Sequence, residues 1–235
     1  MSDPAFRIIE SFGIVNTSVS EDSSDYGFPY AGYYLTDREA VVRAKFFNEL
    51  NADRTTAANI LARQFDAGGG GAGGEAETGH LNLAWSASNS ILRPGQRALL
   101  VLDVEIGSGM HLYAPGDHRY LAIEWEMSAA AGVEFQETVF PPAEMKHLAA
   151  IKEIVPVYHD TIRIVRDIHI LGGKEFPEEL QGKDSLEITG VFKYQACDAD
   201  KCYFPAKIPL KWTFELQDHD LVRAPEELRR GASNQ

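Results

Sequence analysis

Six short segments in which apolar residues alternate with polar ones follow one another along most of this chain, and glycine, proline or aspartate separates them. In LVLDVEI and TIRIVRDIHI the alternation is typical of strands with one face on a core and one face in water. Short strands at this spacing predict an antiparallel β-sandwich. The expected strands are residues 81–87, 97–106, 121–127, 161–170, 185–194 and 208–216.

A glycine-rich run, DAGGGGAGGEAETG, precedes these strands at residues 66–79. Glycine has no side chain to bury and loses the most backbone entropy on ordering, so the run predicts a flexible linker. A phosphate-binding loop would need Lys-Ser or Lys-Thr after the glycines, and neither follows. We therefore divide the chain into a first segment (1–65), the linker (66–79), a sandwich (80–217) and a polar tail (218–235).

The first segment reads as helix, strand, strand, helix. Apolar residues at helical spacing follow Asp3 and Pro4, strand-like runs occupy residues 33–35 and 41–47, and residues 55–65 return to the helical pattern. This order is half of an α/β fold. We expect a mainly β protein whose sandwich is preceded by a partial α/β fragment.

Charge and hydropathy narrow the classes of partner. The formal net charge is -13, which repels nucleic-acid backbones and anionic membranes and favours a neutral or basic protein partner. No apolar run is long enough to span a bilayer. The opening residues MSDPAFRIIESFG lack the pattern of a secretory signal, so the chain as written predicts a cytoplasmic protein.

The sequence contains two cysteines, Cys197 and Cys202, spaced CDADKC. Cys197 ends one strand-like run and Cys202 begins the next, with Asp198 to Lys201 as the connecting loop. A four-residue hairpin loop brings its flanking residues close to the Cα separation that a disulfide requires. The geometry permits the bond and leaves its role open.

Three roles are open to such a pair. A disulfide that closes about six residues stabilises a fold by only roughly 2 kcal/mol, whereas closing a hundred residues would give about 4.7. A short-range pair at an accessible turn favours thiol-disulfide exchange with a partner. A closed zinc site needs four ligands, and CDADKC offers two. Exchange is our first hypothesis, a structural disulfide the second, and a metal site the least favoured.

Charges beside the cysteines set their expected reactivity. Asp198 and Asp200 should raise the pKa of the thiols, and Lys201 partly opposes them. We expect thiols that are weakly activated, so that fast transfer has to be organised inside a complex with a specific partner.

The residues GVFKYQACDADKCYFPAKIPLKWTFEL resemble the cysteine strand of the N-terminal domain of DsbD, the bacterial transmembrane thiol:disulfide reductase. The resemblance continues through GMHLYAPGD, AIEWEM, VFPPAEM and VPVYHDTIRI, and covers about residues 80–217. It implies an immunoglobulin-like sandwich in the periplasm without a cofactor or metal. The domain would receive electrons from a membrane-embedded partner and pass them to thioredoxin-like proteins.

The same resemblance implies the residues of the site. Cys197 and Cys202 match the redox pair, which this family shields with aromatic residues and a cap loop. The cap loop would be residues 146–153, and Phe204 stands where the family often has proline. The implied supporting or shielding residues are Tyr113, His111 in place of an aromatic residue, Tyr194, Asp198, Asp200 and Tyr203.

The first segment is similar to a different family. SDPAFRIIESFGI, YGFPYAGYYLTDREAVVRAKFF and RTTAANILARQF resemble the C-terminal half of the AhpC/TSA peroxiredoxins, which have a thioredoxin-like fold. This truncated fragment contains no cysteine, so it implies no peroxidase activity of its own. It does suggest a peroxiredoxin as a partner, and the exposed sheet edge of residues 31–47 predicts a homodimer.

Together these features predict an electron relay in which Cys197 and Cys202 exchange disulfides with thioredoxin-like partners. The alternative is a non-enzymatic immunoglobulin-like binding module with a structural disulfide.

Overall fold

The computed structural model describes residues 7–23, 26, 29–48, 57–64, 72–148 and 153–218. None of the helices in these ranges is long and apolar enough to cross a membrane. The elements, in chain order, are α1 (Arg7–Ser11), β1 (Ala31–Thr36), β2 (Val42–Asn48), α2 (Ala57–Gln64), β3 (Gly74–Glu77), β4 (Leu81–Ala87), β5 (Ile91–Leu92), β6 (Arg97–Ile106), β7 (His111–Tyr113), β8 (Glu124–Met127), β9 (Val133–Val139), β10 (Glu144–Leu148), β11 (Glu153–Tyr158), β12 (Thr161–Ile170), the 3₁₀ turns η2 (Gly173–Glu175) and η3 (Glu178–Leu180), β13 (Ser185–Tyr194), β14 (Ala196–Cys197) and β15 (Ala206–Leu216).

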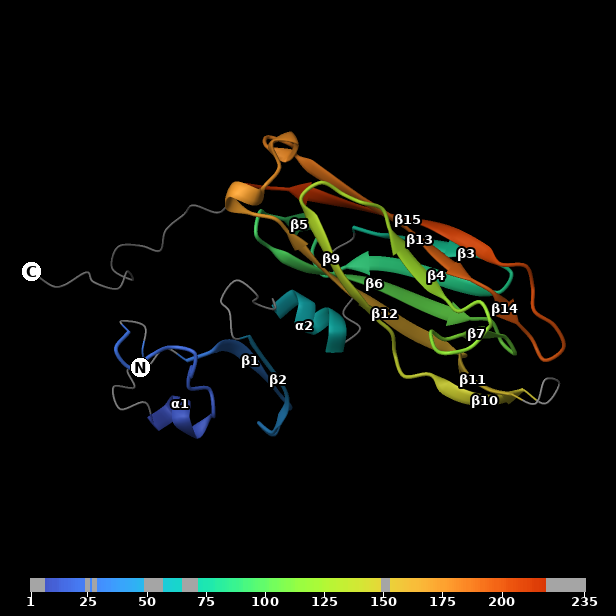
Figure 1. Ribbon diagram of the computed structural model, residues 1–235, viewed down its shortest axis with the longest axis horizontal. Coiled ribbons are helices and arrows are strands. Elements are labelled where there is room, and N and C mark those ends of the chain that lie inside the picture. The colour runs from blue at the N-terminus through green and yellow to red at the C-terminus, as the bar shows by residue number, and fades with distance from the viewer. Residues whose placement is uncertain are drawn as a thin grey trace, which may run out of the picture.

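Two sheets form the sandwich that the strand pattern predicts (Figure 1). One has the strand order β3-β4-β6-β12-β9 and the other the order β5-β15-β13-β8. A third sheet, β10-β11-β7-β14, lies at one end, and β1 and β2 form a separate hairpin. The pairs are antiparallel except β5 with β15, which is parallel. The prediction of a mainly β, immunoglobulin-like antiparallel sandwich is confirmed.

The core lies between the two main sheets. Along β13 and β15 every second residue is buried, so their apolar faces meet the inner face of β4 and β6. Two tryptophans also tie the sheets together by hydrogen bonds. Trp212 Nε1 donates to the carbonyl of Ser86 at 2.9 Å, and Trp85 Nε1 donates to the carbonyl of Lys211 at 2.9 Å. Both indole donors are therefore satisfied while their rings exclude water.

The last part of the predicted linker belongs to the sandwich, which corrects our expectation for residues 72–79. Gly74–Glu77 forms β3 and pairs with β4, and Ala72 is buried in the core. A Cβ on Gly73 would lie 1.7 Å from the carbonyl oxygen of Trp85, and one on Gly74 would lie 2.7 Å from its ring. These glycines allow a close approach of two strands, a use that composition does not distinguish from flexibility. Residues 66–71 lie outside the described ranges.

The outer face of β6 is also more buried than its alternating pattern predicts. Leu99 and Val101 point away from the core, yet they are buried with Val165 against Ala62 of α2. Arg63 of α2 forms an ion pair with Asp167. A helix from the first segment therefore covers part of the sheet face that we expected to be in water.

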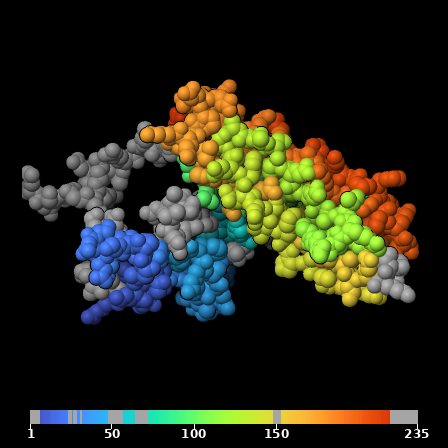
Figure 2. Space-filling view, in the orientation of Figure 1, coloured from blue at the N-terminus to red at the C-terminus, as the bar shows by residue number. Residues whose placement is uncertain are grey.

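The rest of the first segment packs on itself. β1 and β2 pair from Ala31↔Asn48 to Thr36↔Val42, which confirms the two predicted strands. The ring of Tyr34 contacts that of Phe12 beyond α1, and its hydroxyl donates to the Phe12 carbonyl at 2.7 Å. Figure 2 shows the blue N-terminal residues beside the green-to-red sandwich. The loop between β14 and β15 lies at the opposite end of the long axis (Figure 1). The predicted tail beyond Asp218 lies outside the described residues.

Candidate redox site

Cys197 and Cys202 form a disulfide in the loop that joins β14 to β15, with a Cα separation of 3.9 Å. Both residues come from the predicted four-residue hairpin, in which the Asp198 amide donates to the Lys201 carbonyl at 2.9 Å. The Tyr203 amide donates to the Ala196 carbonyl at 2.8 Å just outside the bond. The sequence-predicted pair is thus brought together by local backbone pairing.

The two sulfur-bearing residues differ in exposure. Cys197 is 1% exposed and packs against Tyr113, Val155 and Val157. Cys202 is exposed at the surface of the loop. A thiol from another protein can therefore approach one side of this disulfide, that of Cys202.

Asp198 organises the loop. Its Oδ1 accepts hydrogen bonds from the amides of Asp200 and Lys201, both at 2.8 Å, and its Oδ2 accepts one from the Tyr203 hydroxyl at 2.9 Å. These donors, the Asp200 amide first, hold the pKa of Asp198 below its ordinary value. Asp198 therefore carries its negative charge at neutral pH, beside Cys197.

Tyr203 links this loop to the sandwich. Its ring lies 4.3 Å from that of His80, between centroids, and Lys201 Nζ lies 4.8 Å from the Tyr203 ring centroid. Asp198 and Tyr203, both predicted as supporting residues, are thus partners in one hydrogen-bonded loop. His80 was missed, because nothing in its sequence context distinguishes it from an ordinary turn residue.

Two stacked tyrosine rings lie beside the disulfide. The Tyr113 hydroxyl lies 4.0 Å from Cys202 Sγ, and the Tyr113 ring stacks on that of Tyr120 at 4.6 Å. The Tyr120 hydroxyl donates to Glu153 Oε2 at 2.5 Å. Burial first, then the nearness of Tyr120 and Glu153, raises the pKa of Tyr113, which keeps its hydroxyl protonated. Tyr113 is one of the predicted shielding residues; Tyr120 was missed, because its contact depends on tertiary folding.

The predicted cap loop, residues 146–153, coincides with the β10–β11 hairpin. Its two described ends both reach the aromatic residues: Lys146 Nζ lies 3.5 Å from His111 Nδ1, and Glu153 binds Tyr120. Residues 149–152 lie outside the described ranges. His111 is 2% exposed, and it faces Cys197 across the β7–β14 pairing.

Other predicted site residues lie apart from the sulfur atoms. Tyr194 is buried in the main core, where its hydroxyl donates to Thr78 Oγ1 at 3.1 Å. The Asp200 side chain is exposed, and its amide serves the Asp198 turn. Phe204 is 95% exposed, two residues after Cys202.

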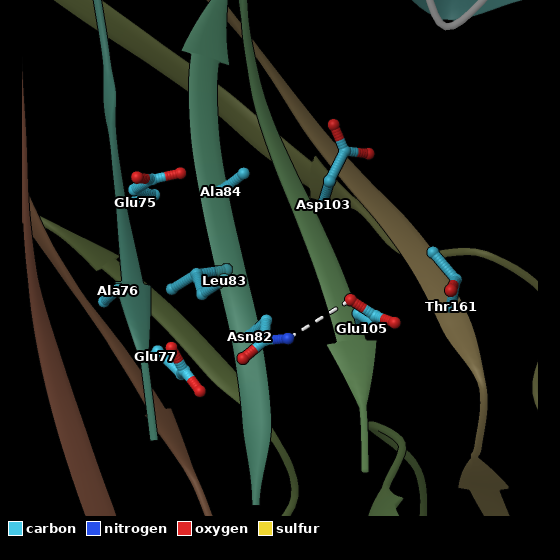
Figure 3. A pocket seen from close by; sticks show the side chains of 9 residues that line it. All are labelled: Glu75, Ala76, Glu77, Asn82, Leu83, Ala84, Asp103, Glu105 and Thr161. Carbon is cyan, nitrogen blue, oxygen red and sulfur yellow. Dashed lines mark hydrogen bonds between the residues drawn. The ribbon is translucent and has the colours of Figure 1, made fainter. Parts of the chain in front are cut away.

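An acidic hollow lies elsewhere, on the outer face of the five-stranded sheet (Figure 3). The carboxylates of Glu75 and Glu77 come from β3 and those of Asp103 and Glu105 from β6, and Asn82 donates to Glu105 at 3.3 Å. Asp103 is paired with Arg163. Within the described ranges, no group of three or more His, Cys, Asp or Glu side chains is placed to hold a metal ion.

The structure is thus an immunoglobulin-like β-sandwich domain with a disulfide in a short loop at one end, and one cysteine of that disulfide is exposed. The model of one family, the N-terminal domain of the thiol:disulfide interchange protein DsbD, matches residues 81–210, which include both cysteines. The chain belongs to this family. The family takes its name from a thiol:disulfide interchange protein. None of the curated proteins matches the chain.

Solved structures give weaker likenesses. The N-terminal periplasmic domain of ScsB from Proteus mirabilis aligns over 59% of this chain and 49% of its own, with 14% identity and a TM-score of 0.40. The Neisseria meningitidis DsbD N-terminal domain in the reduced form aligns over 50% of this chain and 82% of its own, with 18% identity and a TM-score of 0.33. The alignment with the first of these covers about half of that protein's chain.

Replacing Asp198 with alanine tests its place in the loop. Because its folded pKa is lower than the unfolded value of 3.8, its contribution to stability is present above that pH and is lost as the pH falls through the folded pKa. We expect wild type to have a higher Tm than Asp198→Ala near neutral pH and the difference to shrink in acid below pH 3.8. Thermal unfolding of the oxidised proteins measures it. Asp200→Ala is the control for loss of an exposed charge from the same loop, and an Asp198→Ala difference that stays constant into acid contradicts the assignment.

Proposed function

We propose that Cys197 and Cys202 are a redox pair that passes reducing equivalents between thioredoxin-like partners. The observation that carries the proposal is the unequal exposure of the two cysteines within a bond that closes a short loop. A partner's thiolate would attack the accessible Cys202 Sγ, and Cys197 would leave as the thiolate. The reduced chain would then pass its electrons on by the reverse exchange with an oxidised partner.

The structural-disulfide alternative finds less support. The bond spans a sequence separation of 5, so it constrains the unfolded chain little and contributes about 2 kcal/mol. The hairpin is also held by backbone hydrogen bonds on both sides of the bond. Breaking the disulfide therefore costs the fold little, which suits a bond that opens and closes.

The site is poorly suited to reaction with thiols at random. The charge of Asp198 disfavours a thiolate beside it, and the Tyr113 hydroxyl lies 4.0 Å from Cys202 Sγ. Reaction would therefore be fast only where a partner displaces water from the loop and positions its own thiolate. This supports a relay between specific proteins.

Several further expectations accompany this proposal. The partners would be thioredoxin-like proteins and a membrane-embedded reductase, and the place of action the periplasm. Residues 1–65 would be a peroxiredoxin-like fragment without peroxidase activity, followed by a linker and the sandwich domain. A peroxiredoxin would be a candidate partner of the whole chain, and residues 31–47 a candidate homodimer edge, which size-exclusion chromatography tests.

Single-cysteine variants test the direction of attack. Cys197→Ser leaves the exposed Cys202, and Cys202→Ser leaves the buried Cys197. Because accessible thiols react faster, we expect Cys202 to react with a disulfide reagent about tenfold faster or more. Cys197→Ser should also form a mixed disulfide with oxidised thioredoxin, and Cys202→Ser should form much less. Equal reactivity of the two folded variants, or faster reaction of Cys197, contradicts the proposed direction.

Phe204 offers a contact for such a partner. Its side chain is 95% exposed and stands two residues from Cys202. The few residues that dominate the binding energy of an interface lie near its centre and contribute about 2 kcal/mol or more each. A thioredoxin-like protein that brings its thiolate to Cys202 would cover Phe204 with the apolar surface around its own cysteines.

Phe204→Ala should therefore slow reduction by a protein partner and leave reduction by dithiothreitol unchanged. We expect the rate with reduced thioredoxin at limiting concentration to fall about thirtyfold, as the loss of about 2 kcal/mol predicts. Phe12→Ala, at an exposed phenylalanine in the N-terminal segment, is the matched control and should change neither rate. Equal losses with both reductants would show that Phe204 shapes the loop instead of the interface.

A further inference from the structure

His111 and Cys197 face each other across the β7–β14 pair. They are Cα partners in the antiparallel register. Side chains at directly opposite positions lie on the same face, with Cβ atoms about 4.5–5.5 Å apart. His111 is 2% exposed and Cys197 is 1% exposed. The imidazole and the buried sulfur thus share one water-poor environment.

Lys146 determines which ring nitrogen of His111 carries the proton. Lys146 Nζ lies 3.5 Å from His111 Nδ1, and an ammonium group can only donate hydrogen bonds. Nδ1 must therefore be the acceptor. The pKa of His111 is lowered by burial first and by the charge of Lys146 second, while Asp198 raises it. A neutral ring with an accepting Nδ1 has its proton on Nε2.

The Nε2 atom of His111 is buried and has no hydrogen-bond partner among the described residues. The ring of Tyr113, two residues along the same strand, meets the His111 ring edge-on, with 5.6 Å between the centroids. Most buried polar atoms in native proteins have a hydrogen-bond partner, so an unpaired one needs an explanation. His111 and Cys197 lie opposite each other in the register, and a disulfide sulfur is a poor acceptor for an N–H on this face. A thiolate at the same position would be a strong one.

We infer that His111 donates a hydrogen bond from Nε2–H to the Cys197 thiolate when the disulfide opens, with Lys146 as the residue that positions the ring. This inference deepens the proposed function and rests on the opening of the bond by a thiolate. In that step a bond forms between the partner's sulfur and Cys202 Sγ, and the Cys197–Cys202 bond breaks. Its electron pair goes to Cys197 Sγ. The imidazole keeps its proton. The positive charge of Lys146, which lies at Nδ1 of the same ring, also stabilises the new thiolate.

The arrangement favours Cys197 as the leaving group. Burial alone would raise the pKa of the Cys197 thiol and slow its departure. Three neighbouring groups act on the charge that develops there: Lys146 from β10 and His111 from β7 stabilise it, and Asp198 from the loop opposes it. His111 and Lys146 would thus offset part of the cost of placing a thiolate in the interior.

The test measures the pKa of Cys197 as the sole thiol, in a Cys202→Ser background, by the ultraviolet absorbance of the thiolate. We expect His111→Phe to raise this pKa by about one unit, the shift that loss of one hydrogen bond to the charged form gives. Lys146→Met should raise it less, and Lys146→Arg should restore it. Lys183→Met is the control, because it removes the same charge two residues before β13 begins, at the end of that strand away from Cys197. Circular dichroism verifies that each variant is folded.

The outcomes separate this inference from the proposed function. Folded His111→Phe and Lys146→Met variants with the parent's thiol pKa overturn it, even if the chain still exchanges disulfides with thioredoxin. A raised pKa supports it, even if no relay partner is found. Should His111→Phe fail to fold, the Lys146→Met and Lys146→Arg pair on the hairpin decides between the two results. A shift in Lys183→Met equal to that in Lys146→Met also overturns it, because the effect would then be one of net charge.

Discussion

The pairing of β13 with β15 is the constraint on which the rest of this structure depends. It runs from Ser185↔Glu215 to Tyr194↔Ala206 without a break, and both strands bury every second side chain. A shift of one residue would turn Phe192 and Trp212 out of the core, so the register is strongly specified. The loop that follows is thereby delivered to one end of the sandwich with Cys197 beneath it and Cys202 on its surface.

This placement makes the two cysteines differ in exposure. The chain places one sulfur where a partner can reach it and the other where water cannot. A histidine, a tyrosine and a charged loop aspartate surround the buried cysteine. A disulfide in this setting is held by the surrounding backbone rather than holding it, and that is why we assign it to exchange.

Long periodic strands could be predicted from the sequence, and very short ones could not. The bounds of β4, β6, β12 and β13 agree with the alternating pattern, because every second residue of each strand faces the main core. Strands as short as β7 and β14 are too brief to show any period. The covering of Leu99 and Val101 by α2 depends on a helix that is distant in the chain, and the pairing of β3 depends on close approach at glycines.

The same limit applies to the site. Both cysteines and the aspartate between them are adjacent in the chain, so their meeting is local and could be predicted. Tyr120 and His80 reach the site through tertiary folding, and their sequence contexts carry no sign of it. His111 and Lys146 were noticed only as members of a shielding segment. Their mutual contact depends on the pairing of β10 with β11 and of β11 with β7, which the sequence pattern does not show.

The reduction potential of the Cys197–Cys202 pair tests the central claim most directly. It is measured by equilibrating the purified chain in glutathione or dithiothreitol buffers and trapping the free thiols. The account predicts a value within the range of proteins that exchange disulfides, roughly -120 to -270 mV. A value below about -300 mV is that of a structural disulfide and would contradict the assignment of this bond to electron transfer.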